Sequence, residues 1–374
     1  MSAIAEDRWN AVITWLDEPL RTTDEGPLAG KTLLVKDLID TAGIRTTYGS
    51  RLYADHVPER HALVVQRALD AGATIVGKAN LVEFAWGVLG GNEFYGTVHN
   101  PVRPGRTTGG SSSGNAAAIA GGLCDLGIGT DTGCSVRLPA AACELVGLKP
   151  RLGTIPTDGV YPLCPSFDTV GPMARTVDEA AVFWSVLSGR PIPEPRLDGL
   201  VVGLLRRAPN IGDGRETERS DAVDEWAGRL EALGARVVEA EIPGPSADTW
   251  PVFLHEAARS HAATFPSRAD EYGSVIRVKL EAAQRVDPEA VDEGYRALLA
   301  WRRLVPEADL FACPCVAIDW PAEDAPELDV RLPLSSFMRW VNLLGWAGLA
   351  IGNLQLVAPH EETVLAAGLA WERS

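Results

Sequence analysis

The chain has 374 residues, of which 46% are hydrophobic and 22% are charged, a balance typical of proteins that bury a sizeable core. Its 34 basic and 50 acidic residues give a net charge of −16, which argues against nucleic acid or an anionic membrane as a partner. No secretory signal and no run of about 18 apolar residues is present. We therefore expect a cytoplasmic protein without a membrane span, whose six cysteines are reduced.

The first 190 residues alternate between short apolar runs and amphipathic segments. The elements predicted at the start are a helix at 9–16, a strand at 32–35, a helix at 62–71, a strand at 74–76 and a short helix at 80–86. The strand at 32–35 leads directly into Lys36. Strands and helices continue to alternate up to Pro150, which is the pattern of an α/β fold.

The second half of the chain predicts further elements of both kinds. They are a helix from the capping residue Thr176 to about 187, a strand at 201–205, a helix at 221–233, a strand at 236–240, a mostly helical region at 250–305, a strand at 310–312, a helix at 334–349, a strand at 354–357 and a helix or strand at 363–371. No change in composition marks a boundary. We therefore expect residues 1–374 to form a single domain.

The stretch Gly109–Arg137 reads GGSSSGNAAAIAGGLCDLGIGTDTGCSVR. Its glycine and serine content would suit a flexible linker. However, Ala116–Leu123 favours a helix and Leu126–Thr130 favours a buried strand, which a linker would not contain. The better interpretation is two backbone turns that hold hydroxyl groups close to exposed N–H groups.

Two known serine-based chemistries fit these turns poorly. Gly110–Gly114 matches the nucleophile elbow G-x-S-x-G with Ser112 as nucleophile, but that elbow needs a strand before it, and residues 100–108 are a polar loop with two prolines. A Ser-x-x-Lys arrangement is absent, since Ser274 and Lys279 have the wrong spacing. A third interpretation is a relay in which Lys36 acts on serines of the two turns.

The residues of this stretch resemble the amidase signature family. Its defining motif, G-G-S-S-G-G-S followed by G-T-D-T-G-G-S-[IV]-R-x-P, is similar to GGSSSGN at Gly109–Asn115 and to GTDTGCSVRLP at Gly129–Pro139. Further segments that look like family blocks are Val35–Ser50, Ala71–Ala85, Tyr95–Pro101, Val146–Pro150 and Ser166–Thr176. The resemblance is strong over residues 27–190 and weaker beyond them.

The resemblance implies a catalytic lysine at Lys36, a bridging serine in a cis peptide bond at Ser111 and a nucleophile at Ser135. These roles are chemically coherent. A serine hydroxyl needs a base, and a lysine can serve as one only when burial lowers its pKa enough to leave it neutral. Ser111 both accepts and donates hydrogen bonds, so it can pass a proton from Ser135 to Lys36.

Preorganised donors for an oxyanion are expected from the backbone N–H groups of Thr132, Gly133 and Cys134, just before Ser135. Cys134 stands where the family usually has glycine, and its side chain is expected to narrow the acyl site.

Three further residues are assigned supporting roles. Asp131 and Arg137 flank the second turn with opposite charges, and we interpret them as a structural pair that braces it. Ser112 is the supporting residue of the first turn.

The family's fold implies a central mixed β-sheet with helices on both faces. In that arrangement residues 27–190 form the catalytic core, and residues 191–374 complete the sheet and the substrate pocket. The second half is shorter than is common in the family, and Asn342–Pro359 looks like two family blocks fused. The pocket is therefore expected to be open or completed by another subunit. Candidates for its lining are Trp250, Trp301, Trp320, Trp340 and Trp346, although for each one singly a core or dimer-contact role is favoured.

The sequence thus predicts an amidase that hydrolyses a small-molecule carboxamide through an acyl-enzyme on Ser135. No metal and no organic cofactor is implied. The expected partner is the small amide alone, with no nucleic acid and no membrane, and a homodimer is left open. Two alternatives remain: an amidotransferase subunit that releases ammonia for a partner protein, and a family member that binds without hydrolysing.

Overall fold

The computed structural model describes residues 6–211, 217–220 and 222–374. The strands are β1 (Val12–Leu20), β2 (Thr32–Lys36), β3 (Thr74–Ala79), β4 (Leu126–Asp131), β5 (Val146–Lys149), β6 (Thr169–Ala174), β7 (Val201–Leu204), β8 (Arg236–Glu239), β9 (Leu310–Pro314), β10 (Ala347–Ile351) and β11 (Leu354–Ala358). They form one mixed sheet with the order β1-β3-β2-β4-β6-β5-β10-β11-β9-β7-β8. Strands from the two halves of the chain thus meet where β5 pairs with β10.

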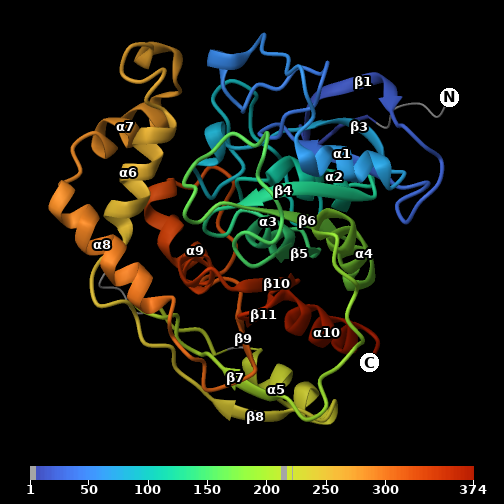
Figure 1. Cartoon of the computed structure of the whole chain (residues 1–374), viewed down its shortest axis with the longest axis vertical. Helices are drawn as coiled ribbons and strands as arrows, with labels where there is room; N and C mark the ends of the chain where they lie inside the picture. Colours follow the sequence, from blue (N-terminus) through green and yellow to red (C-terminus); the bar gives the residue numbers. More distant parts are fainter. Residues whose placement is uncertain (1–5, 212–216, 221) are drawn as a thin grey trace.

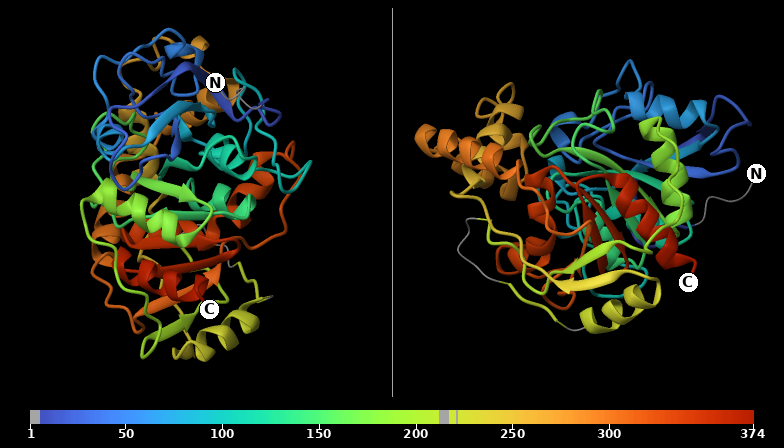
Figure 2. Two further views of the ribbon diagram at one scale, coloured as in Figure 1. Left: turned by 90° about the vertical axis from the view of Figure 1, so that its right-hand side faces the viewer. Right: turned by 60° about the horizontal axis from the view of Figure 1, so that its bottom comes forward.

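Helices cover both faces of this sheet (Figures 1 and 2). They are α1 (Leu63–Asp70), α2 (Ser113–Ala120), α3 (Arg137–Ala142), α4 (Val177–Ser188), α5 (Val223–Ala232), α6 (Trp250–Ser260), α7 (Ser274–Ala283), α8 (Pro288–Trp301), α9 (Glu327–Leu344) and α10 (Glu361–Glu372), with 3₁₀ turns at Arg51–Tyr53, Glu83–Ala85 and Ala269–Glu271. Helices α1, α4 and α10 pack together on one face, and α2, α3 and α9 pack on the other. The predicted α/β fold is confirmed.

The predicted helix at residues 9–16 is wrong, because Val12–Leu20 form the edge strand β1 instead. This strand pairs antiparallel with β3, where Val12 lies opposite Ala79. Most of its side chains are half-buried or exposed, so the sequence lacks the regular alternation that marks a strand. Pairing satisfies the backbone groups along the outer side of β3, which outweighs the local helical pattern.

The predicted helix at residues 334–349 joins two different elements. Helix α9 begins earlier, at Glu327, and ends at Leu344, where Gly345 adopts a left-handed conformation with φ +73°. Residues 347–351 then form β10, which is buried between β5 and β11. A short apolar run that follows a helix cannot be separated from it by periodicity alone.

The helices α6, α7 and α8, called the helical arm, stand to one side of the sheet next to α9 (Figure 1). They confirm the prediction that residues 250–305 are mostly helical. The other predicted elements are present with shifted boundaries, the segment at 80–86 contains only a 3₁₀ turn, and the segment at 363–371 is helical. Residue 221, where one predicted helix begins, lies outside the described residues. None of the described helices combines the length and apolar character that a membrane crossing requires.

Candidate active site

Lys36 is the last residue of β2, which runs parallel to both of its neighbours, β3 and β4. Its side chain is fully buried, and its Nζ donates hydrogen bonds to Ser111 Oγ at 2.7 Å and to Thr130 Oγ1 at 2.8 Å. Sequence reasoning did not single out Thr130. The parallel pairing of Val35 with Ile128 places Thr130 near Lys36, one residue beyond the level position, and that signal appears only once the strand order is known.

Burial dominates the electrostatics of Lys36. Removal of its ammonium group from water lowers the pKa of Lys36 to about 7, against the opposing influence of the Asp131, Asp168 and Cys134 side chains. Both hydrogen-bond partners of Lys36 are neutral hydroxyl groups, and no carboxylate contacts its Nζ directly within the described residues. A lysine with such a pKa is partly neutral near pH 7, which a general base requires.

The first turn, residues 109–112, precedes helix α2. Gly109 has φ +68°, and the bond between Gly110 and Ser111 is cis, as the family resemblance implies. Ser111 is fully buried and faces Lys36. Ser112 points elsewhere, since its Oγ lies 3.3 Å from Thr130 O on β4. The turn therefore presents Ser111, rather than Ser112, to the lysine.

The second turn, residues 131–135, follows β4 and leads into α3. Ser135 is 6% exposed and lines a cavity, while its backbone carbonyl accepts a hydrogen bond from Ser112 N at 3.2 Å. The two turns are thereby joined through their backbones. Within residues 6–211, 217–220 and 222–374, the hydroxyls of Ser111 and Ser135 form no hydrogen bond with each other. The link from Ser135 to Ser111 that the predicted relay requires is therefore not made in this structure.

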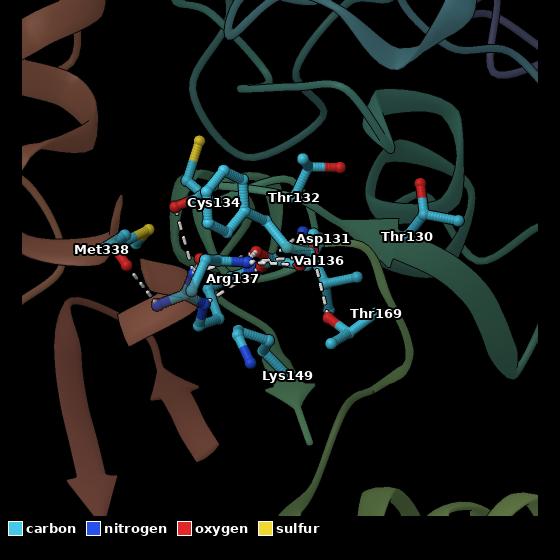
Figure 3. A network of polar contacts seen from close by, with 12 residues as sticks. Thr130, Asp131, Thr132, Cys134, Val136, Arg137, Lys149, Thr169 and Met338 are labelled. Carbon is cyan, nitrogen blue, oxygen red and sulfur yellow. Dashed lines mark hydrogen bonds and ion pairs between the residues drawn. The ribbon is translucent and has the colours of Figure 1, made fainter. Parts of the chain in front are cut away.

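A cluster of polar side chains lies beneath the second turn (Figure 3). This bracing cluster consists of Asp131, Arg137, Asn342 and Gln355, and all four are buried. Arg137 Nη2 lies 2.9 Å from Asp131 Oδ1 and 2.6 Å from Asn342 Oδ1, and its Nη1 donates to Gln355 Oε1 at 2.7 Å. The predicted partners Asp131 and Arg137 thus lie together. Their contacts with Asn342 and Gln355, more than 200 residues away, were not predicted.

The charge on Asp131 is held in place by this cluster. Burial by itself raises the pKa of Asp131, but the charge of Arg137 and the hydrogen bonds that it donates outweigh burial and bring the pKa down to about 2. The other carboxylate oxygen accepts from the backbone N–H groups of Val136 at 3.1 Å and Arg137 at 3.3 Å. An ionised carboxylate therefore fixes the start of α3 directly behind Ser135.

The cavity at Ser135 has a volume of about 230 Å³ and lies between the second turn, the helical arm and α9. Thr132, Gly133 and Cys134 form part of its wall beside Ser135. Cys134 is almost completely buried, and burial raises the pKa of its thiol to about 12. The thiol is therefore neutral near pH 7, which argues against Cys134 as a thiolate nucleophile, and its narrowing of the acyl site stays a prediction.

Aromatic and charged side chains also line the cavity. Trp250 stacks on Phe253 with ring centroids 4.6 Å apart, and the guanidinium groups of Arg331 and Arg339 lie 5.9 and 5.1 Å from the Trp250 ring. Of the five tryptophans considered as candidates for a pocket lining, Trp250 lines this cavity, whereas Trp340 is a fully buried core residue. The sequence did not distinguish these cases, because both tryptophans lie on amphipathic helices.

Comparison with known proteins shows to which family the chain belongs. The family model described as Amidase matches residues 9–354, nearly the whole chain. The chain belongs to the amidase family. A solved structure, described as the crystal structure of an amidase, shares 30% sequence identity with a TM-score of 0.81, and the match covers 93% of this chain and 85% of that one.

Two curated relatives are similar over most of the sequence, and both are named as a subunit of glutamyl-tRNA(Gln) amidotransferase. The relative from Natronomonas pharaonis is 40% identical over 71% of this chain and 66% of its own length. The relative from Chromohalobacter salexigens is 31% identical over 95% of this chain and 84% of its own length. In the first of these matches the chain therefore spans just under two thirds of its relative.

These relatives contradict the expectation of a small-molecule amide as the sole partner, with no nucleic acid. Each is named as part of a larger assembly, and the name of the enzyme includes a tRNA. The expectation came from the net charge of −16, which describes the surface of this chain alone. Net charge bears on direct binding of nucleic acid, but not on contacts that other members of an assembly make.

Proposed function

We propose that this chain cleaves the carboxamide of an amide donor, and that a partner protein uses the released ammonia on a glutamyl group carried by tRNA. The observation that carries the chemical part is the buried Nζ of Lys36, 2.7 Å from Ser111 Oγ, with a pKa lowered to about 7 by burial. The names of the relatives support the transfer part.

In the proposed reaction Ser111 passes the hydroxyl proton of Ser135 to neutral Lys36. Ser135 Oγ then bonds to the carboxamide carbon, and the backbone N–H groups of the second turn stabilise the negative oxygen that forms. The proton returns through Ser111 to the nitrogen, the C–N bond breaks, and ammonia leaves. A water molecule then gives a proton to Lys36 through Ser111 and attacks the ester carbon. The bond from that carbon to Ser135 Oγ breaks, Ser135 regains its proton, and the acid leaves.

The missing hydrogen bond between Ser111 and Ser135 is compatible with this proposal. Catalytic hydrogen bonds are often long or absent without substrate and tighten when it binds. The amide nitrogen and the carbonyl carbon of a bound donor would lie in the cavity, beside the second turn. Lys36 and Ser111 are already joined, so only the last step of the relay awaits the substrate.

The test measures ammonia release from glutamine and from asparagine by the purified chain, alone and after co-expression with candidate partners. We expect slow release by the chain alone, an increase of at least tenfold in a stable complex, and no release by Ser135→Ala in either state. Equal release with and without a co-purifying partner would contradict the transfer role. Unchanged release by Ser135→Ala would contradict the chemistry itself.

A second candidate, hydrolysis without any partner, is favoured by the aromatic wall of the cavity. Trp86, Phe167, Trp250 and Phe253 offer an apolar surface next to Ser135, which would suit a bulkier acyl group than that of glutamine. The same assay with aromatic and long-chain primary amides separates the two functions. Faster turnover of these amides than of glutamine, with no effect of a partner, would favour the second candidate.

A further inference from the structure

We propose that Asn342, on α9, is a positioning residue that orients the backbone of the second turn toward the oxyanion. The inference rests on the proposed acyl-enzyme chemistry at Ser135. Asn342 comes from the second half of the chain and is 1% exposed, and its amide contacts the turn at Asp131. It would act on the reaction through the peptide planes of the turn, without touching the substrate.

Both ends of the Asn342 amide are engaged by the bracing cluster. Its Nδ2 donates to the backbone oxygen of Asp131 at 3.0 Å and to Asp131 Oδ1 at 3.0 Å. Its Oδ1 accepts from Arg137 Nη2 at 2.6 Å. The fixed donor and acceptor of one planar amide therefore connect the backbone of the turn to the side chain that braces it.

Two carbonyl groups of the second turn point into the bracing cluster. The carbonyl of Asp131 accepts from Asn342 Nδ2 and also from Thr169 Oγ1 at 2.8 Å, and the carbonyl of Gly133 accepts from Arg137 Nη2 at 3.1 Å. Figure 3 shows the contacts from Thr169 and Arg137 on the same side of the turn. Both peptide bonds are trans, since cis bonds in the described chain occur elsewhere.

In a trans peptide the N–H group of the next residue points opposite to the carbonyl. Anchoring the carbonyls of Asp131 and Gly133 therefore turns the N–H groups of Thr132 and Cys134 away from the bracing cluster. Those two residues line the cavity beside Ser135. Neither N–H donates a hydrogen bond to any residue that the structure describes, so both remain available to a ligand oxygen.

Asn342 thus helps to fix the orientation of the Thr132 and Cys134 N–H groups. An oxyanion hole gains its effect from donors that need no reorganisation when charge develops. Loss of the Asn342 amide would leave the Asp131 carbonyl with Thr169 alone, so the first peptide plane of the turn could rotate. The relay should keep its pH midpoint, because the hydrogen bond between Lys36 and Ser111 involves no atom of the bracing cluster and Arg137 still keeps Asp131 ionised.

The experiment measures the second-order rate at which a fluorophosphonate probe labels Ser135, as a function of pH, together with the melting temperature. The probe forms a tetrahedral adduct whose oxygen needs the same donors as a substrate. The variants are Asn342→Ala and Thr169→Val, and the second removes the hydroxyl donor to the Asp131 carbonyl with almost no change of shape. The control is Asn92→Ala, whose amide also donates to two backbone carbonyls, those of Gly49 and Leu81, outside both turns.

We expect Asn342→Ala to label roughly 10- to 100-fold more slowly than wild type, less than the 10²- to 10³-fold loss of a whole oxyanion donor. Thr169→Val should slow labelling in the same direction, and the pH midpoint should stay that of wild type in both. Asn92→Ala should lower the melting temperature without slowing the labelling of folded protein.

Three results would overturn the inference. In the first, folded Asn342→Ala and Thr169→Val label within twofold of wild type. In the second, the pH midpoint moves together with the rate, which would place Asn342 in the proton relay. In the third, wild type itself is not labelled at Ser135, which would overturn the proposed function as well. If wild type is labelled at Ser135 and the two variants label equally fast, only the positioning role fails. If wild type is not labelled at Ser135, the proposed chemistry fails as well.

Discussion

The carboxyl ends of β2 and β5 each hold a buried lysine, and the two ends differ in what the lysine contacts. Lys36 and Lys149 are both fully buried, and burial lowers the pKa of each to about 7. Lys36 donates to the hydroxyls of Ser111 and Thr130, whereas Lys149 donates to the backbone carbonyls of Pro150 and Trp346, each at 2.7 Å.

This difference separates a candidate base from a structural lysine. A carbonyl oxygen only accepts hydrogen bonds, so a proton on Lys149 has no onward route through its partners. A hydroxyl accepts and donates at once, so Ser111 can connect Lys36 to a nucleophile. A lowered pKa is therefore insufficient to identify a catalytic lysine, and the chemistry of the hydrogen-bond partners decides.

The largest expected effect contrasts the two lysines directly. Lys36→Ala should reduce labelling of Ser135, and any ammonia release, by about 10³-fold, within the range for loss of a general base. Lys149→Met should reduce them less than tenfold while it destabilises the fold, since a buried acceptor left unpaired costs about 1–3 kcal/mol. Equal losses of activity per folded molecule in the two variants would contradict the conclusion that only Lys36 acts as a base.

The pH dependence sharpens the comparison further. Lys36 must be neutral to accept a proton, so the labelling rate should rise with pH around a midpoint near the pKa of about 7 and fall in acid. Lys149→Met should keep this midpoint, even though Lys149 has a similarly lowered pKa. A series of stopped labelling reactions from pH 5 to pH 9, with folding monitored by circular dichroism at each pH, measures both curves. If the midpoint of Lys149→Met differs from that of wild type, the base would be Lys149 and not Lys36.

A smaller effect is expected in stability. Lys36 has a pKa of about 7 when folded but 10.5 as its ordinary value, so between these values the unfolded chain binds more protons. The cost of burying Lys36 is therefore complete below pH 7 and fades as the pH rises toward 10.5. Lys36→Met should be more stable than wild type at pH 7, and this advantage should shrink by about 1.4 kcal/mol for each rise of one in pH.

Urea unfolding of both proteins at pH 7 and pH 9 measures the change. Lys149 titrates in both proteins and cancels in the difference. An advantage of Lys36→Met that is independent of pH would show that Lys36 keeps its ordinary pKa in the folded protein.

The smallest expected effect concerns the second hydroxyl partner of Lys36. Thr130→Val removes one acceptor from the ammonium form, so the pKa of Lys36 should fall further and the midpoint of the rate should move to lower pH by less than about one unit. The rate at high pH should change only a few-fold, because Ser111 stays in place. Thr130→Ser should restore the wild-type midpoint, and failure to do so would assign the shift to packing instead of the hydroxyl.

Much of the fold could be predicted from local sequence, and the resemblance to the amidase signature family supplied the first catalytic candidates. The glycine-rich turns and the apolar run before Lys36 are short-range signals, and the structure brings Lys36 and Ser111 into contact. Whether Lys36, Ser111 and Ser135 act as proposed stays a prediction. Thr130 was missed because its proximity to Lys36 depends on the parallel pairing of β2 and β4.

The contribution of the second half to the site was beyond the reach of sequence patterns. Asn342 lies 211 residues from Asp131, and an asparagine on an amphipathic helix gives no sign of its partner. The end of α9 was also missed, because Gly345 interrupts a continuous apolar run whose continuation is a strand. In each case a long-range pairing decides between local patterns that are equally compatible with the residues.

The order of strands in the sheet has a consequence for the biosynthesis of the enzyme. Strands β10 and β11 follow all other strands in sequence, yet they lie inside the sheet between β5 and β9. A ribosome releases Lys36, Ser111 and Ser135 long before residues 342–358 have been translated. The second turn therefore gains Asn342 and Gln355 only after the rest of the sheet has been made. A nascent chain of this protein should remain inert toward amides until its central strands are inserted.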